Sequence, residues 1–135
     1  MNLAAVMDDL GTALGQVQGL RVFPFSADKV HPPAAVVLWP ERIDYDATMT
    51  RGADRITMPV AVLVGRVDQR SARDALAKYM DGSGPDSVKT AVESFTGQSS
   101  WSSVRVKTAT PDSFESGGTT YIGALFAIDI IGTGA

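Results

Sequence analysis

The sequence predicts an α+β fold, with a mostly antiparallel sheet of four to five strands, an N-terminal helix and a two-helix insertion packed on one face. The clearest sign is a change of hydrophobic period, from two in residues 56–64 to about 3.6 in residues 70–80. Alternating strand patterns stand on both sides of this helical segment, so the helices interrupt a single sheet. Residues 1–135 show no internal repeat or linker and are predicted to form one domain.

The first half of the chain is predicted to contain one helix and up to three short strands. Apolar residues from Leu3 to Val17 recur at helical spacing, which predicts an amphipathic helix over residues 2–18, ended by Gly19. Apolar and β-branched runs follow, and the third of them continues the second after a bulge. The expected strands are residues 22–25, 34–39 and 43–46. The polar run from Ala47 to Ala53 is predicted to be a loop or hairpin tip.

The second half is predicted to contain a long strand, two helices and two more strands. The alternating strand of residues 56–64 comes first, and Pro111 to Gly118 is predicted to be a polar connection. The other expected elements are helices over 70–81 and 86–96 and strands over 102–110 and 119–131. The last strand is apolar on both faces, so it should lie in the centre of the sheet or be covered by another subunit.

Composition limits the classes of protein to which the chain can belong. Hydrophobic residues make up 44% and charged residues 20%, as in soluble globular domains. The absence of cysteine removes disulfides, thiolate zinc sites and cysteine nucleophiles. A net charge of −3 argues against a DNA-binding protein with a basic face. The first twenty residues contain no Lys or Arg, and the apolar run 121–131 is too short to cross a bilayer, so we expect cytosolic synthesis and no membrane partner.

No pattern of residues predicts an active site. His31 is the only histidine, and Asp44 and Asp46 lack the spacing of a calcium loop, so a solvated hairpin is the simpler interpretation. Gly82-Ser83-Gly84 follows a helix and has no Gly-Lys-Ser/Thr ending, so it is not a phosphate loop. We therefore expect no catalysis, metal or cofactor. A small-ligand-binding or enzymatic domain that uses His31, Asp44 and Asp46 remains an alternative.

Several polar and aromatic side chains are candidates for contacts between subunits, each with a solvated or core position as the alternative. They stand in the segment 45–54, at the junction before and within the helix 70–81, and in the segment 111–118. Asp129 interrupts an apolar strand and needs a partner, for which Arg105 or Lys107 on the preceding strand is expected. The candidate interface residues are Tyr45, Met49, Arg51, Arg55, Arg66, Arg70, Arg73, Phe114, Glu115 and Asp129.

The order of elements resembles a family of assembly proteins. The segments that carry the resemblance are the amphipathic helix 3–17, the Pro-rich approach to an apolar strand over 30–40, the strand and helix of 54–80, the short helix 88–95 and the apolar strand 121–131. In this order they resemble the tail terminator (neck) proteins of long-tailed, siphovirus-type phages, in the form common in actinobacterial phages. The resemblance covers nearly the whole chain, although no single motif fixes it.

This resemblance implies a structural role in the virion. Family members are α+β subunits that close into a homohexameric ring, cap the tail tube, end its polymerisation and join the tail to the head. The expected partners are therefore other copies of the chain, the tail tube protein, a head-completion or connector protein, and genome DNA that passes through the lumen without specific binding. The resemblance implies no enzyme activity, no cofactor, assembly in the host cytoplasm and a final place at the tail–neck junction. Another neck or tail-completion protein is the nearest alternative.

Overall fold

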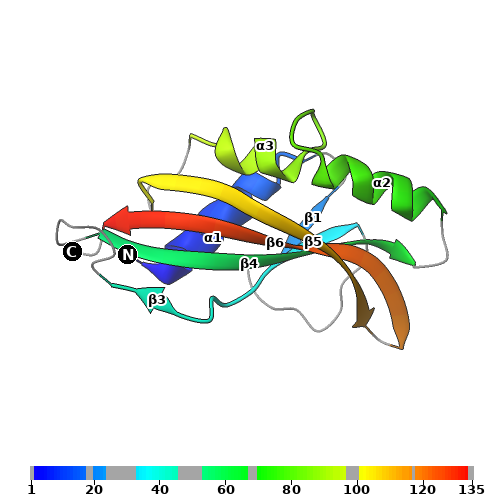
Figure 1. Ribbon diagram of the computed structural model, residues 1–135, viewed down its shortest axis with the longest axis horizontal. Coiled ribbons are helices and arrows are strands. Elements are labelled where there is room, and N and C mark those ends of the chain that lie inside the picture. The colour runs from blue at the N-terminus through cyan, green and yellow to red at the C-terminus, as the bar shows by residue number, and fades with distance from the viewer. Residues whose placement is uncertain are drawn as a thin grey trace.

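The computed structural model describes residues 2–17, 20–23, 33–45, 53–66, 70–96, 101–116 and 118–133. It confirms the predicted α+β class, with a mostly antiparallel sheet, an N-terminal helix and two further helices (Figure 1). The sheet has six strands in this part of the chain, one more than the upper limit of the prediction. The additional strand is short, because the apolar run after residue 33 divides into two separate pieces.

The sheet is built around three long strands. They are β4 (Ala53–Arg66), β5 (Ser103–Ser116) and β6 (Thr119–Thr133), and β6 lies between the other two. The short strands β1 (Arg21–Phe23), β2 (Ala34–Val37) and β3 (Ile43–Asp44) complete the sheet on the β4 side. All pairs are antiparallel except β1 with β2. The last strand therefore lies inside the sheet, between two long strands, which is one of the two positions predicted from its apolar faces.

Strands β2 and β3 share one side of β4. Val37 pairs with Val60, and Ile43 pairs with Ile56, so the chain leaves the sheet between these two points. Pro59 stands at this gap, just beyond the last residue of β4 that pairs with β2, and its carbonyl accepts the N–H of Leu38 at 3.0 Å. The third strand was predicted to continue the second after a bulge; instead, β2 and β3 are separate strands that pair with different parts of β4.

The β5–β6 hairpin is longer than the sequence predicted. The polar connection expected from Pro111 to Gly118 is wrong, because residues 111–116 continue β5 and pair with β6 as far as Ser116 and Thr119. Pro111 is accommodated because β5 is an edge strand, and edge strands tolerate a missing ladder donor. Gly118 has a φ of +80°, a value that suits the tight turns of two-residue hairpins. Pairing with an apolar strand thus outweighs the polar composition of the segment.

The three helices begin close to their predicted positions and end somewhat earlier. They are α1 (Leu3–Leu14), α2 (Arg70–Met80) and α3 (Val88–Glu93). The side chain of Asn2 caps α1 by accepting the N–H of Ala5, and buried Ser87 caps α3 by accepting the N–H of Thr90. None of the described helices is long and apolar enough to cross a membrane.

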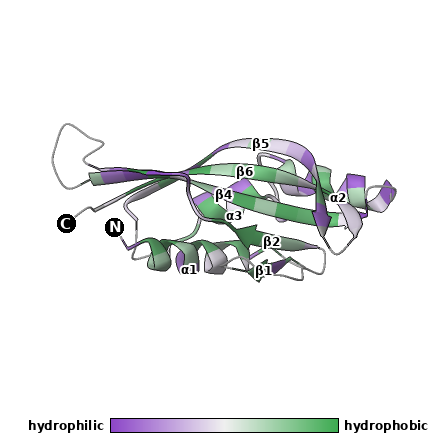
Figure 2. Cartoon of the chain, turned by 90° about the horizontal axis from the view of Figure 1, so that it is seen from below, coloured by the Kyte–Doolittle hydropathy of each residue, from purple (hydrophilic) through white to green (hydrophobic). Residues whose placement is uncertain are grey.

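A single apolar core joins the helices to one face of the sheet. Even-numbered residues of β4 and β6 point into it, together with the buried sides of all three helices. Figure 2 shows this hydrophobic character along β4 and β6. Its largest fully buried side chains include Leu10, Leu14, Met58, Phe126 and Ile128. Burial of each such side chain contributes roughly 1.5–3 kcal/mol, so this core supplies most of the driving force for the fold.

Each of the two tryptophans could be a core aromatic or an interface anchor by its residue type, and the structure places them in different environments. Trp101 is buried in the core with its ring centroid 6.4 Å from that of Phe95. Trp39 is 65% exposed, beside the end of β2. The core interpretation is therefore confirmed for Trp101 and wrong for Trp39, which leaves Trp39 as a candidate contact residue.

Candidate functional site

The face of the sheet opposite the core carries a shallow groove of about 470 Å³. Its floor is formed by side chains that alternate with the core residues of β4 and β6, and by the part of β5 after its bulge at residue 107. The rim comes from the segment that connects β2 to β3. The floor residues are Thr57, Pro59, Thr108, Thr110, Leu125 and Ala127, and the rim residues are Glu41, Arg42 and Asp44.

The chemistry of this groove favours contact with another molecule over catalysis. Its floor offers hydroxyl and aliphatic groups, and its rim offers two carboxylates and one guanidinium, with Arg42 Nε 3.5 Å from Asp44 Oδ1. Among the described residues, no group of three or more His, Asp or Glu side chains could hold a metal ion. Asp44 belongs to the rim. The alternative ligand-binding or catalytic site also used His31 and Asp46, and these two residues lie outside the described residues.

Large exposed apolar side chains flank the groove. Trp39 and Tyr45 stand at the two ends of the rim segment and are 65% and 72% exposed. Leu125, on the floor, is 37% exposed. An amphipathic aromatic side chain that is held at the edge of a groove is typical of a protein interface. Tyr45, a predicted contact residue, is therefore free to contact a partner.

Arg55 and Asp129 form a two-pronged ion pair on the same face. Arg55 Nε lies 2.9 Å from Asp129 Oδ1, and Nη2 lies 2.9 Å from Oδ2. The carboxylate is only 13% exposed and the guanidinium 46%, so Arg55 covers the acid. The hydrogen bond with Asp129 and its negative charge raise the pKa of Arg55. Two predicted interface residues are thus paired with each other within one chain.

The expected partner of Asp129 was wrong. Arg105 lies directly opposite Asp129 on β5, yet the acid is bound by Arg55 of β4, whose register partner on β6 is Ile131. Diagonal neighbours on a sheet are within reach of long side chains, and a guanidinium fork fits both oxygens of a carboxylate. The sequence could not show this because the pairing of β4 with β6 joins segments about seventy residues apart.

The remaining candidate residues lie at the other end of the sheet or on α2. Arg66 pairs in register with Tyr121, and Tyr121 with Phe114, so these strand ends lie together. Phe114 is half-buried and packs against Gly123 of β6, which favours packing on its own sheet over an exposed contact. Glu115, Arg70 and Arg73 are exposed. Met49 and Arg51 lie outside the described residues.

The free edge of β5 is partly closed by side chains. At Val106 the N–H donates to Glu93 Oε2 at 2.9 Å, and the carbonyl accepts Lys89 Nζ at 3.4 Å. Farther along, the N–H of Ser113 donates to Asp112 Oδ1 at 2.8 Å, and Pro111 has no N–H. Such capping protects an edge strand from pairing with another chain. Contacts through faces are therefore favoured over strand addition at this edge.

Sequence reasoning missed the groove floor, which depends on residues from three strands. Thr57 and Leu125 stand at the non-core positions of alternating patterns, whereas the pattern places Thr108 on the same face as Val104 and Val106, from which the bulge at residue 107 removes it. The exposed face of a strand is visible in the sequence, but the neighbour across the sheet is not. Only the strand order β4-β6-β5 brings these side chains together.

Comparison with known proteins assigns no family to the chain. No protein-family model matches it, and no curated protein matches it. The resemblance to tail terminator proteins therefore rests on the order and character of the elements, and any function must be argued from the surfaces that these elements present.

Proposed function

We propose that this protein is a structural subunit of a phage virion, a tail terminator whose copies form a ring at the end of the tail tube. The observation that carries the proposal is the groove face of the sheet, which holds Leu125 on its floor. Exposed Trp39 and Tyr45 stand just before and just after the residues that form its rim. Exposed apolar groups that gather beside a groove mark sites of protein–protein contact. A ring subunit needs such a face for its neighbour.

The shape of the subunit supports assembly into a ring. A ring formed by head-to-tail contacts needs two different surfaces on each copy. One face of this sheet is covered by helices, while the opposite face carries the groove. The end of the β5–β6 hairpin extends from the body (Figure 1). The number of copies, six, and the roles in ending tube growth and joining the head come from the family resemblance.

The charge of the chain supports the proposed relation to DNA. A net charge of −3 disfavours strong binding to DNA, because contacts between basic residues and phosphates dominate DNA affinity. A lumen formed by such subunits would let DNA pass without retaining it. The proposed protein partners are the tail tube protein on one side and a head-completion or connector protein on the other.

Deletion of the gene in the phage that encodes the protein tests the role. We expect over-long tails without heads, and restoration of normal virions by the wild-type gene supplied from a plasmid. Tails of normal length after deletion would contradict the role in ending tube growth. Tails of normal length that lack heads would instead assign the protein to another neck or tail-completion step.

Electron microscopy of the purified protein mixed with tail tubes tests the proposed contact face. Wild-type protein is expected to form rings at tube ends. Leu125→Lys places a charge on the groove floor and should fold normally but lose ring formation, because the exposed position tolerates the side chain while an interface does not. Ala4→Lys, at an exposed position of α1, is the matched control and should retain rings. Rings formed by Leu125→Lys would exclude the groove face as the contact.

A further inference from the structure

We infer that two oppositely charged surfaces of this chain, a basic face of α2 and an acidic end of the β5–β6 hairpin, bind each other between neighbouring copies. The basic helix face consists of Arg70 and Arg73. The acidic hairpin end consists of Asp112 and Glu115. The inference rests on the proposed function because it requires the chain to assemble with itself, and it adds two charged surfaces to the groove face as contacts between copies.

The basic helix face is exposed and only partly neutralised. Helix α2 buries Ala72 and Leu76 in the core and leaves both arginines outside. Arg73 Nη2 lies 3.2 Å from Asp74 Oδ1, an ion pair between adjacent, solvent-exposed residues. Arg70 forms no ion pair with any residue that the structure describes. Among the described residues, Arg70 therefore has no partner of opposite charge, and Arg73 shares its charge only with an exposed carboxylate.

The position of these arginines in α2 also favours an anionic partner. They occupy the first turn of the helix, which contains no acidic residue. The helix dipole places partial positive charge at this end, so cations there are unfavourable and anions favourable. The arrangement is electrostatically unfavourable in an isolated chain and becomes favourable when a carboxylate approaches the first turn.

The acidic hairpin end is held rigidly and carries no cation. Residues 108–128 include Asp112 and Glu115 as their charged residues and contain no Lys or Arg. Asp112 Oδ1 accepts the N–H of Ser113, which orients the carboxylate, and Phe114 packs on Gly123 between the two acids. Both acids are exposed. Because residues three apart on a strand point to opposite faces, the paired hairpin presents one negative charge on each of its faces.

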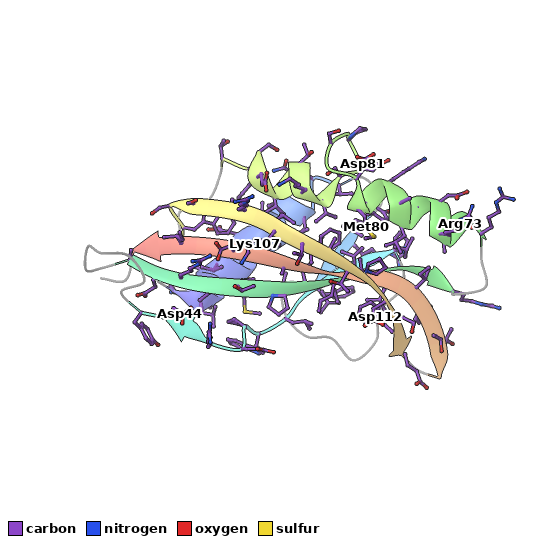
Figure 3. All side chains as sticks on the ribbon, viewed as in Figure 1. Asp44, Arg73, Met80, Asp81, Lys107 and Asp112 are labelled. Carbon is purple, nitrogen blue, oxygen red and sulfur yellow. The ribbon has the colours of Figure 1, made fainter. Side chains whose placement is uncertain are left out.

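The two surfaces lie on different sides of the same end of the molecule. Figure 3 shows Arg73 on α2 and Asp112 on the part of β5 that curves away from that helix. No ion pair between the described residues joins these two surfaces within a chain. Two different, complementary surfaces on one subunit produce a head-to-tail contact, which closes into a ring when the rotation allows it. Their charges should set the association rate and the register of neighbouring copies.

Charge reversal followed by mixing tests this contact. The hairpin variant is Asp112→Arg with Glu115→Arg, and the helix variant is Arg70→Glu with Arg73→Glu. Each variant alone presents two surfaces of like charge and should self-associate at least about tenfold more weakly than wild type. In an equimolar mixture each surface of one variant faces an opposite charge on the other, so assembly should return. Sedimentation velocity measures both, and circular dichroism confirms that each variant is folded.

The control for this experiment reverses charges elsewhere on the chain. Asp8→Arg on α1 and Arg21→Glu on β1 are exposed positions and should leave assembly at the wild-type level. Assembly of the wild type should also weaken when the salt concentration rises from about 50 mM to about 500 mM, because salt screens exposed charges.

Three outcomes would overturn the inference. Wild-type assembly by either variant alone would show that these charges do not form the contact, and a mixture that stays unassembled would show that they do not bind each other. In both cases rings of wild-type protein on tail tubes would leave the proposed function intact. Wild-type protein that never self-associates, alone or on tubes, would overturn the inference and the proposed ring together.

Discussion

Arg55 and Asp129 show how a single polar pair is accommodated on an otherwise apolar strand. The carboxylate is largely covered, and both of its oxygens accept hydrogen bonds from one guanidinium at 2.9 Å. A charge in such a position is costly without a partner and acceptable with a well-aligned one. The pair thus allows an acid in the central strand of the sheet.

A double-mutant cycle tests this pair. Asp129→Ala and Arg55→Ala should show a favourable coupling free energy, because either change removes both hydrogen bonds of the pair. Urea denaturation measures the free energy of unfolding of each variant. Arg105→Ala, at the position directly opposite Asp129, is the control and should couple by less than about 0.5 kcal/mol. A larger coupling with Arg105 would contradict the observed pairing.

Glu93 gives a pH-dependent prediction. Partial burial would raise the pKa of its carboxyl, but hydrogen bonds from Lys89 Nζ and the Val106 N–H outweigh burial and lower it from 4.5. A lowered pKa means that the folded state binds this proton less readily, so the stabilisation is present above pH 4.5 and is lost as pH falls through the folded-state pKa. The Glu93 carboxylate therefore stabilises the fold in neutral and weakly acidic solution.

The substitution Glu93→Gln should remove this contribution. We expect the free energy of unfolding to fall by about 1 kcal/mol at pH 7, and the difference from wild type to shrink towards zero at about pH 3. Urea titrations at the two pH values measure it. Glu41→Gln, on the exposed rim of the groove, is the control and should change stability by less than about 0.5 kcal/mol at either pH. A constant difference across the range would contradict the assignment.

At the scale of elements, the β5–β6 hairpin is the clearest departure from the sequence prediction. Polar residues and Pro111 indicated a connection, yet the segment forms a strand because β6 offers a complete row of partners. Because β5 is an edge strand, its polar side chains remain in water and their burial costs no free energy. The long α1, β4 and β6 elements were predicted correctly because their apolar periodicity is sustained over many residues.

Gly123 of β6 is a position where β4 and Phe114 of β5 approach so closely that a side chain does not fit. A Cβ there would overlap the carbonyl oxygen of Val62 and lie 3.0 Å from the ring of Phe114. Gly123→Ala should therefore lower the free energy of unfolding by about 2–4 kcal/mol, because the strands must separate to admit the methyl group. Thermal unfolding followed by circular dichroism measures the loss.

The matched control is Gly82→Ala, where a Cβ meets no atom within 4 Å. This substitution should change the free energy of unfolding by less than about 0.5 kcal/mol. Equal effects at the two glycines would show that close packing at Gly123 does not constrain the hairpin.

At the scale of the whole molecule, one apolar core links the helices to the sheet. All three helices contribute buried residues to the cluster that contains the core side chains of β4 and β6. Lys89 and Glu93 of helix α3 also form hydrogen bonds with the backbone of Val106 in β5. The insertion of α2 and α3 is therefore expected to unfold together with the sheet.

Equilibrium unfolding tests this cooperativity. In a Trp39→Phe variant, fluorescence reports on Trp101, which is buried beside Phe95, and far-ultraviolet circular dichroism reports on the secondary structure. The two transitions should coincide in urea, as expected for a small two-state domain. A fluorescence transition with its midpoint at a lower urea concentration than the circular dichroism transition would indicate a separately unfolding region around α3.

The candidate surfaces were only partly predictable. Exposed positions such as Tyr45 and Glu115 were identified from their polar surroundings, and Arg70 and Arg73 from the polar side of a helix. The groove was not predicted, because its floor combines residues from β4, β5 and β6. Nor did the sequence show that Arg55 neutralises Asp129 and that Phe114 covers Gly123.

By itself, the sequence determined the α+β class, the alternation that assigns each strand one core face, and the amphipathic helices that cover it. These properties depend on local periodicity. Residues three or four apart share one face of a helix, and residues two apart share one face of a strand, so the pattern can be read from the sequence. Tertiary structure alone decided the strand order, the long hairpin and the partner of Asp129. These depend on register between distant segments, where a shift of one residue exchanges the two faces of a strand.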